Sequence, residues 1–78
     1  MYVYIIRSES NPTEFYIGVS QDPIRRLEEH NSGLSIHTSK FRPWSLQATI
    51  WFTNPKKAYP FERWLKSGSG RAFKKRHF

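Results

Sequence analysis

Two runs of alternating side chains near the N-terminus predict a pair of short β-strands. Residues 1–7 (MYVYIIR) and residues 15–20 (FYIGVS) are rich in β-branched and aromatic residues, which favour extended backbone. The segment between them, residues 8–14 (SESNPTE), contains the turn-forming residues Ser, Asn and Pro. We therefore predict an antiparallel hairpin.

The register of this hairpin decides which side chains share a face. Directly opposed residues of an antiparallel pair have a constant index sum, and an even sum places Tyr4 opposite Tyr16 or Gly18, on their face of the sheet. An odd sum would place the two phenols on opposite faces. We predict the even sum, in which Gly18 leaves space beside Tyr4 for another group.

Capping residues predict a helix directly after the second strand. Asp22 offers a side-chain acceptor and Pro23 suits the first helical position. The helix is expected to end at Asn31, with Asn31 and Gly33 as its stop. Arg26 and His30 are four residues apart and therefore share one face of this helix. A guanidinium and an imidazole thus join the two phenols within a short stretch of chain.

A second pair of capping residues predicts another helix near the C-terminus. Asn54 followed by Pro55 is the signal for its start, and the segment Ser67–Gly70 is expected to end it. Pro60 falls inside this pattern. It is expected either to kink the helix near its start or to delay the start to about Tyr59.

Three further segments complete the predicted fold. Residues 46–53 form a third strand, residues 32–45 a long connection, and residues 71–78 a short helical turn or a frayed tail. One face of the third strand is expected to be apolar throughout: Leu46, Ala48, Ile50 and Phe52. The order strand, strand, helix, strand, helix predicts an α+β fold, a three-stranded antiparallel sheet flanked by helices.

The composition favours one small domain in a reducing compartment. A length of 78 residues suits a single domain, residues 1–78. The chain has no Cys, so a disulfide framework and a thiolate zinc site are both excluded. No apolar run approaches the length of a membrane span. We therefore expect a cytoplasmic protein without contact with membranes.

The net charge of +7 comes entirely from the C-terminal part of the chain. Residues 1–55 have as many acidic as basic side chains, whereas residues 56–78 have eight basic side chains and one acid. Interleaved aromatic residues favour a surface that binds nucleic acid over a solvated charged tail. The candidate contacts are Lys40, Arg42, Lys66, Arg71, Lys74 and Lys75.

Two acidic side chains need partners. Glu29 is expected to pair with Arg25, four residues earlier, as an ordinary surface ion pair. Glu62 lies at the edge of the apolar arc of the second helix, where a carboxylate without a partner is costly to desolvate. Its partner is either an arginine, Arg26 or Arg7, or a metal ion.

These motifs together resemble the GIY-YIG nuclease domain. The resemblance rests on Tyr2-Val3-Tyr4, on Tyr16-Ile17-Gly18 about a dozen residues later, and on Arg26 ten residues beyond Tyr16. The segments RRLEEHN, RPW and FERWLKSGSGRAF extend it over nearly the whole chain. The likeness is strongest to the small stand-alone bacterial subfamily related to the nuclease domain of the excision-repair protein UvrC.

The resemblance implies hydrolysis of DNA phosphodiester bonds with one divalent metal ion, Mg²⁺ or Mn²⁺. By position, Tyr4 matches the tyrosine that activates the attacking water, and Tyr16 the second motif tyrosine. Arg26 matches the helix arginine, His30 an active-site histidine, and Glu62 the single metal-binding carboxylate. The first triplet of this chain, Tyr2-Val3-Tyr4, differs from the Gly-Ile-Tyr motif of the family. The asparagine that follows the metal glutamate in many family members has no counterpart either, and Lys66 or Lys74 is the candidate for its place.

Selectivity is expected to come from DNA structure, such as branches or nicks, because a domain of this size has a small footprint. A protein partner or a homodimer would add to it. Two alternatives remain open at this point. The chain could be a basic nucleic-acid-binding module without turnover, or an interaction module for an acidic protein.

Overall fold

The N-terminal strand is the centre of the sheet. The computed structural model describes residues 1–78. In it β1 (Tyr2–Ser8) lies between β2 (Phe15–Ser20) and β3 (Trp44–Trp51) and is antiparallel to both. The predicted α+β fold with a three-stranded antiparallel sheet is therefore confirmed, although β3 begins and ends two residues earlier than expected.

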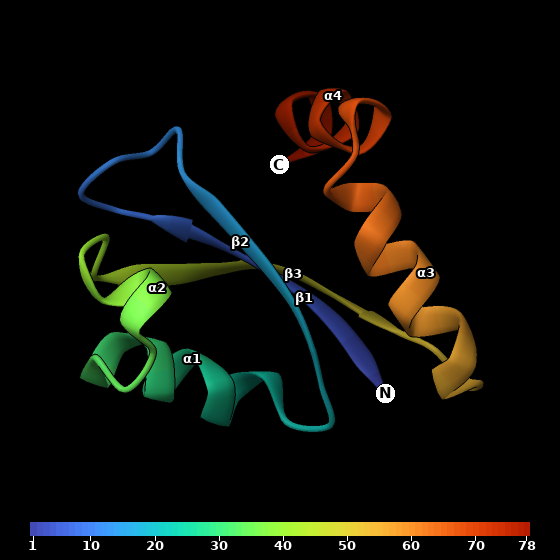
Figure 1. Ribbon diagram of the computed structural model, residues 1–78, viewed down its shortest axis with the longest axis horizontal. Helices are drawn as coiled ribbons and strands as arrows, with labels where there is room; N and C mark the ends of the chain where they lie inside the picture. The colour runs from blue at the N-terminus through green and yellow to red at the C-terminus, as the bar shows by residue number, and fades with distance from the viewer.

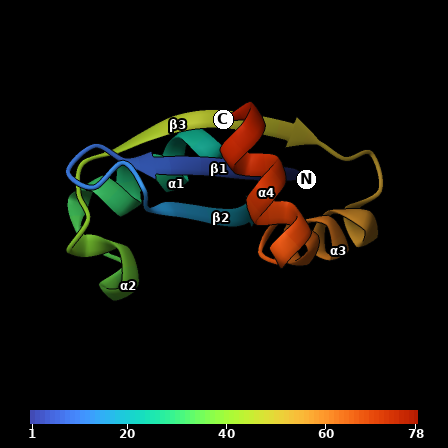
Figure 2. The same ribbon diagram turned by 90° about the horizontal axis from the view of Figure 1, so that it is seen from above.

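Helices cover the two faces of the sheet separately. On one side lie α1 (Pro23–Ser32) and the single turn α2 (Ile36–Ser39), and on the other lie α3 (Pro55–Leu65) and α4 (Gly68–His77), as Figures 1 and 2 show. Even-numbered residues of β1 point toward α1 and odd-numbered residues toward α3. The buried core consists accordingly of two clusters: Tyr4, Ile6 and Trp44 on the α1 side, and Val3, Ile5, Ile17, Ala58 and Leu65 on the α3 side.

The register between β1 and β2 follows the predicted even sum. Tyr4 lies opposite Gly18, and Tyr16 lies opposite Ile6, so both phenols project from the same face. The expected free space beside Tyr4 was wrong, because the Tyr4 ring itself fills it. A Cβ atom added to Gly18 would lie 2.4 Å from the Tyr4 hydroxyl oxygen. Gly18 thus serves the close packing of Tyr4 across the strand.

An irregularity in β3 divides the face that was predicted to be uniformly apolar. Ile5 of β1 pairs with Ala48, but the next residue, Ile6, pairs with Leu46, so Gln47 is an extra residue in the ladder. Leu46 therefore packs against the α1-side cluster, whereas Ala48 packs against the α3-side cluster. The sequence prediction was wrong here, because strict alternation does not survive an inserted residue.

Both predicted helix starts are confirmed by their caps. The Asp22 side chain accepts a hydrogen bond from the backbone of Arg25, and the Asn54 side chain accepts one from the backbone of Lys56. Because α3 already begins at Pro55, the alternative start near Tyr59 was wrong. Pro60 is accommodated within the helix, one turn or so after its start.

The C-terminal segment is a complete helix, where we expected a short turn or a frayed tail. Ser67 ends one helix and begins the next, since its hydroxyl accepts a hydrogen bond from the Gly70 backbone. The start of α4 packs tightly on the end of α3: a Cβ atom added to Gly70 would lie 2.1 Å from the Trp64 carbonyl oxygen. This close approach brings the basic side chains of α4 back over the sheet. Each of the four helices is too short and too polar to cross a lipid bilayer.

Candidate active site

A buried chain of three polar side chains connects the sheet to α1 and α2. The Tyr4 hydroxyl lies 2.9 Å from His30 Nε2, and His30 Nδ1 lies 2.8 Å from the Thr38 hydroxyl. Tyr4 is 1% exposed, His30 0% and Thr38 2%, so water does not compete for these bonds. Both ring nitrogens of His30 are thus satisfied, which fixes the orientation of the imidazole.

Tyr16 and Arg26 form the outer layer of the same cluster. The Tyr16 ring lies 4.7 Å from the His30 ring and 6.3 Å from the Tyr4 ring, measured between centroids. Arg26, one turn before His30 on α1, is close enough to the Tyr4 oxygen to act on its ionisation. Tyr16 and Arg26 are only partly buried, so these two side chains are the members that reach solvent.

Burial sets the protonation states of the inner pair. It raises the pKa of Tyr4 above the ordinary value of 10.0, with a further contribution from Tyr16, and Arg26 opposes this rise. Burial also lowers the pKa of His30 below its ordinary value of 6.5, and the positive charge of Arg26 acts in the same direction. At neutral pH the pair is therefore a protonated phenol and a neutral imidazole.

Glu29 and Glu62 form ion pairs with other residues than predicted. Glu29 binds Arg26, with Oε1 2.6 Å from Nη1, so the expected pair with Arg25 was wrong. Glu62 lies 3.5 Å from Lys66 Nζ, one turn along its own helix, so neither Arg26 nor Arg7 is its partner. The structure therefore brings Tyr4, Tyr16, Arg26 and His30 together, while no hydrogen bond or ion pair links Glu62 to them.

Glu62 is compatible with the metal site that the resemblance implies. No group of three or more His, Asp or Glu side chains that could hold a metal ion is present. Mg²⁺ needs no such cage, because it commonly binds through one or two carboxylates and completes its shell with waters and substrate phosphates. The Glu62 carboxylate is partly exposed, and its contact with Lys66 is long for an ion pair, so a divalent cation could replace the ammonium.

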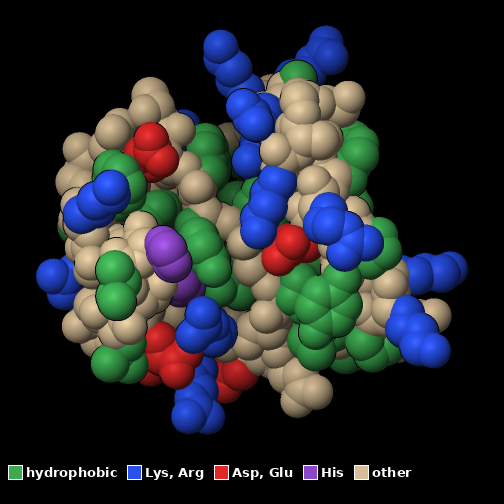
Figure 3. All heavy atoms as spheres, in the orientation of Figure 1, with side chains coloured by type: hydrophobic (Ala, Val, Ile, Leu, Met, Phe, Trp, Pro, Cys, Tyr) green, Lys and Arg blue, Asp and Glu red, His purple; other side chains and the backbone are tan.

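The basic side chains proposed for nucleic acid separate into two groups. Lys40 and Arg42 lie between α2 and β3, and the Arg42 guanidinium donates from Nε to the Ser39 carbonyl. The other group lies on α4 and at the end of α3, where Figure 3 shows basic side chains gathered on the visible face. This second group consists of Lys66, Arg71, Lys74 and Lys75.

Three residues at these sites were missed by the sequence analysis. Thr38 was assigned to a loop, and nothing in the sequence marks a threonine there as a partner for histidine. Arg7 and Phe15 join the basic group of α4 in one pocket. They are directly opposed across β1 and β2 on the odd-numbered face, as in one of the two predicted registers, the one with Tyr4 opposite Gly18. The missing information was the position of α4.

One face of this small α+β sheet brings together phenols, an imidazole and a guanidinium, and the other face is strongly cationic. These groups suit an enzyme that acts on phosphate esters. The chain belongs to the GIY-YIG family, because the model of the GIY-YIG catalytic domain matches residues 1–76. This confirms the expected family and the expected class of enzyme, a nuclease.

Similar proteins include fungal proteins named structure-specific endonuclease subunit SLX1. The protein from Malassezia globosa is 35% identical over 95% of this chain and 18% of its own length. The proteins from Meyerozyma guilliermondii and Kluyveromyces lactis are 48% and 41% identical, over 59% and 76% of this chain and 17% and 23% of their own lengths. The chain thus spans less than a quarter of the length of these relatives. No solved structure gives a significant match.

Proposed function

We propose that this chain is a divalent-metal-dependent endonuclease that cuts structured DNA, such as branched or nicked duplexes, as a single domain of residues 1–78. Family membership supports the reaction, and the relatives' name, structure-specific endonuclease subunit, supports the substrate class and a protein partner. The observation that carries the proposal is the buried Tyr4–His30–Thr38 chain directly behind Arg26.

Arg26 is the proposed clamp on the phosphate. A guanidinium can donate two parallel hydrogen bonds to phosphate oxygens, and it remains charged at every working pH. In the structure its charge is balanced by Glu29 in a partly exposed pair, which a substrate phosphate would displace. Because Arg26 lies beside the Tyr4 oxygen, its movement toward the phosphate would uncover that hydroxyl for a water molecule.

Tyr4 and His30 are the proposed acceptors of the proton from the attacking water. The water oxygen forms a bond to phosphorus as its proton moves to the Tyr4 oxygen, and the phenolic proton passes to His30 Nε2 over the existing 2.9 Å hydrogen bond. The P–O bond to the leaving oxygen breaks in the same displacement. The phenol therefore never needs to become a stable phenolate, whose formation burial opposes. A phosphate at Arg26 would also offset the positive charge that lowers the pKa of His30. Tyr16 covers the pair and takes part in positioning the substrate.

Glu62 is the proposed ligand of the metal ion, Mg²⁺ or Mn²⁺. When bound, such an ion neutralises charge on the phosphate and stabilises the leaving oxygen. Before substrate arrives, Lys66 holds the Glu62 carboxylate, and so takes the place expected for the missing asparagine. We also propose that the chain belongs to the bacterial subfamily related to UvrC and that it is cytoplasmic. A homodimer or a protein partner would add to its selectivity.

The test is cleavage of branched and nicked DNA with and without Mg²⁺ or Mn²⁺. Tyr4→Phe should abolish cleavage and leave DNA affinity within a few-fold, since the phenol is buried and makes no contact with bound DNA until Arg26 moves. Glu62→Ala should abolish turnover together with its dependence on the metal. Glu28→Ala, an exposed carboxylate on α1, is the matched control and should cut normally.

Three results would contradict the proposal. Full cleavage by Tyr4→Phe would remove Tyr4 from the reaction. Unfolding of Glu62→Ala would show that this residue is a structural ion pair. Salt-sensitive DNA binding without any cleavage would instead support the binding module without turnover.

A further inference from the structure

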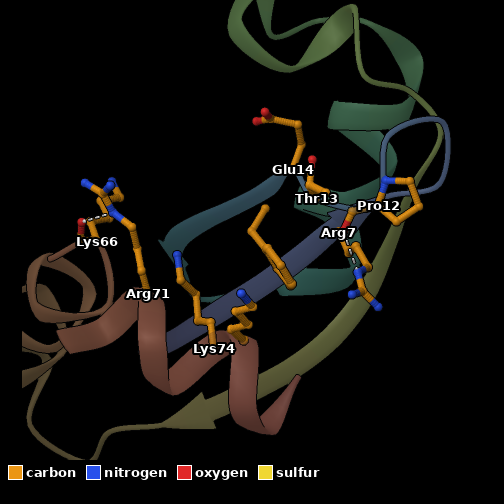
Figure 4. A pocket seen from close by; sticks show the side chains of 9 residues that line it. Arg7, Pro12, Thr13, Glu14, Lys66, Arg71 and Lys74 are labelled. Carbon is orange, nitrogen blue, oxygen red and sulfur yellow. Dashed lines mark hydrogen bonds between the residues drawn. The ribbon is translucent and has the colours of Figure 1, made fainter. Parts of the chain in front are cut away.

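A cationic pocket lies between the β1–β2 hairpin and α4, on the α3 side of the sheet, apart from the tyrosine cluster. Its volume is about 700 Å³. Figure 4 shows Arg71 and Lys74 standing on α4 on the side that faces the hairpin. One wall comes from the hairpin, with Arg7, Pro12, Thr13, Glu14 and Phe15, and the other from the end of α3 and from α4, with Lys66, Arg71, Lys74 and Lys75.

Lys74 is the unusual residue of this pocket. It is only 9% exposed, and its ammonium lies 5.7 Å from the centre of the Phe15 ring. None of the hydrogen bonds or ion pairs in the structure involves this ammonium. Burial lowers the pKa of Lys74, and Arg71 and Lys66 lower it further. The pocket therefore holds a mostly buried lysine whose positive charge faces other cations, an arrangement that a bound anion would relieve.

The other charges of the pocket point to the same kind of ligand. Five basic side chains line it against a single carboxylate, Glu14, which forms no ion pair with any of them. Arg7 is held over the Phe15 ring, 5.1 Å from its centre, and donates from Nε to the Pro12 carbonyl, so the outer nitrogens of its guanidinium keep their donors. Guanidinium and ammonium donors gathered around one pocket suit the oxygens of a phosphate.

The pocket adjoins the proposed metal ligand. Lys66 lines the pocket and also lies 3.5 Å from Glu62, so the two positions share one side chain. We propose that this pocket binds a phosphate group, which in the substrate belongs to the strand that passes Glu62, some distance from the bond that is cut. The role in the substrate rests on the proposed nuclease function, whereas the phosphate site itself does not. Such a subsite would fix the direction and register of that strand.

Binding of short single-stranded oligonucleotides and of inorganic phosphate tests the site. Lys74→Met keeps the aliphatic stem and removes the charge, so it should weaken oligonucleotide binding about tenfold and lower the salt slope by about one. Arg71→Gln, at an exposed position, should weaken it in the same way if Lys74→Met fails to fold. Lys57→Met, an exposed lysine at the start of α3, is the matched control and should change affinity no more than about twofold.

NMR of the lysine side chains separates the sources of phosphate. The Lys74 signal should shift with inorganic phosphate and with an oligonucleotide that lacks terminal phosphates, which supports a backbone phosphate as ligand. If only a terminally phosphorylated oligonucleotide binds more tightly, and this gain requires Lys74, the phosphate site is supported and its ligand is a terminal phosphate. Equal losses in Lys74→Met, Arg71→Gln and Lys57→Met would overturn the site, because they show only a diffuse effect of charge.

Cleavage assays keep the two proposals apart. If the wild-type chain cuts no DNA but Lys74→Met still loses phosphate binding, the pocket stands and the nuclease proposal fails. If the wild-type chain cuts DNA, and Lys74→Met binds and cuts it equally well, the nuclease proposal stands and the pocket is overturned.

Discussion

Gly18→Ala should destabilise the domain, although replacing glycine by alanine within a strand normally does the opposite. The usual gain of about 0.5–1 kcal/mol comes from the smaller conformational freedom of the unfolded chain. Here the new Cβ atom would lie 2.4 Å from the Tyr4 oxygen and 2.5 Å and 2.7 Å from two ring carbons. These contacts are far inside van der Waals distance, so the Tyr4 ring must move.

The loss can be estimated from what holds Tyr4 in place. Its ring is 1% exposed and packs within the cluster of Ile6 and Trp44, where overpacking costs about 1–3 kcal/mol. Displacing the ring also breaks the 2.9 Å hydrogen bond to His30, a loss of about 1 kcal/mol. The net destabilisation is then about 1–3.5 kcal/mol after the backbone gain, out of a total of about 4–12 kcal/mol for a domain of 78 residues.

Urea unfolding followed by tryptophan fluorescence measures this effect through the midpoint and slope of the transition. Gly68→Ala is the matched control, because no atom lies within 4 Å of a Cβ at that position, so it should raise the midpoint slightly. In a Tyr4→Leu background the Gly18→Ala change should lose most of its cost, because the ring it strikes is gone. A Gly18→Ala variant as stable as the wild type, or additive effects in this double-mutant cycle, would refute the reasoning.

Three further predictions concern the polar groups around the same cluster. Because the pKa of His30 is lowered in the native state, its contribution to stability is complete above its ordinary value of 6.5 and is lost as the pH falls through the native value. The urea midpoint should therefore fall between neutral and acidic pH. This pH dependence should disappear in His30→Gln and remain in the control variant His37→Gln. The raised pKa of Tyr4 has the opposite effect on the pH dependence of stability. The contribution of Tyr4 is complete below its ordinary value of 10.0 and is lost as the pH rises through the native value. The last step of a phenolate absorbance titration should therefore disappear in Tyr4→Phe. Asn31→Ala should cost about 1–3 kcal/mol in the same urea assay, since the Asn31 amide both donates to and accepts from the Trp44 backbone, at 3.0 Å and 2.6 Å; a smaller effect would show that other contacts hold α1 to β3.

The parts of the fold that the sequence could predict are those determined by near neighbours. Asp22 and Asn54 cap helices because each is followed by a proline and has backbone donors within three residues. The predicted even index sum placed Tyr4 opposite Tyr16 or Gly18, and the structure has the second of these pairings. Local rules place Tyr4 and Tyr16 on one face of the sheet, and Arg26 and His30 on one face of α1. The four side chains meet because α1 packs on that face of the sheet.

The parts that could not be predicted depend on how distant elements pack. The residues Ser67 and Gly70 look the same in the sequence whether the chain only ends a helix there or also begins another one. The close packing of α4 on α3 decides between these outcomes. The extra residue at Gln47 has no marker in a strand of otherwise regular alternation. The pocket around Lys74 follows from the placement of α4, so the sequence showed its charges without its shape.

The two ion pairs of the proposed site differ in kind from its buried hydrogen bonds. The side chains of Arg26 and Glu29 are 39% and 30% exposed, and those of Lys66 and Glu62 are 53% and 20% exposed. Exposed ion pairs contribute about 0–1 kcal/mol, less than the roughly 1.5–3 kcal/mol of a hydrogen bond to a charged group such as a phosphate. The substrate can therefore take over Arg26, and a metal ion can take over Glu62, at little cost, while the inner chain of Tyr4, His30 and Thr38 stays fixed. In the proposed mechanism this combination suits hydrolysis of a phosphodiester, because the phosphate can enter and leave while the geometry of the Tyr4–His30 pair is kept.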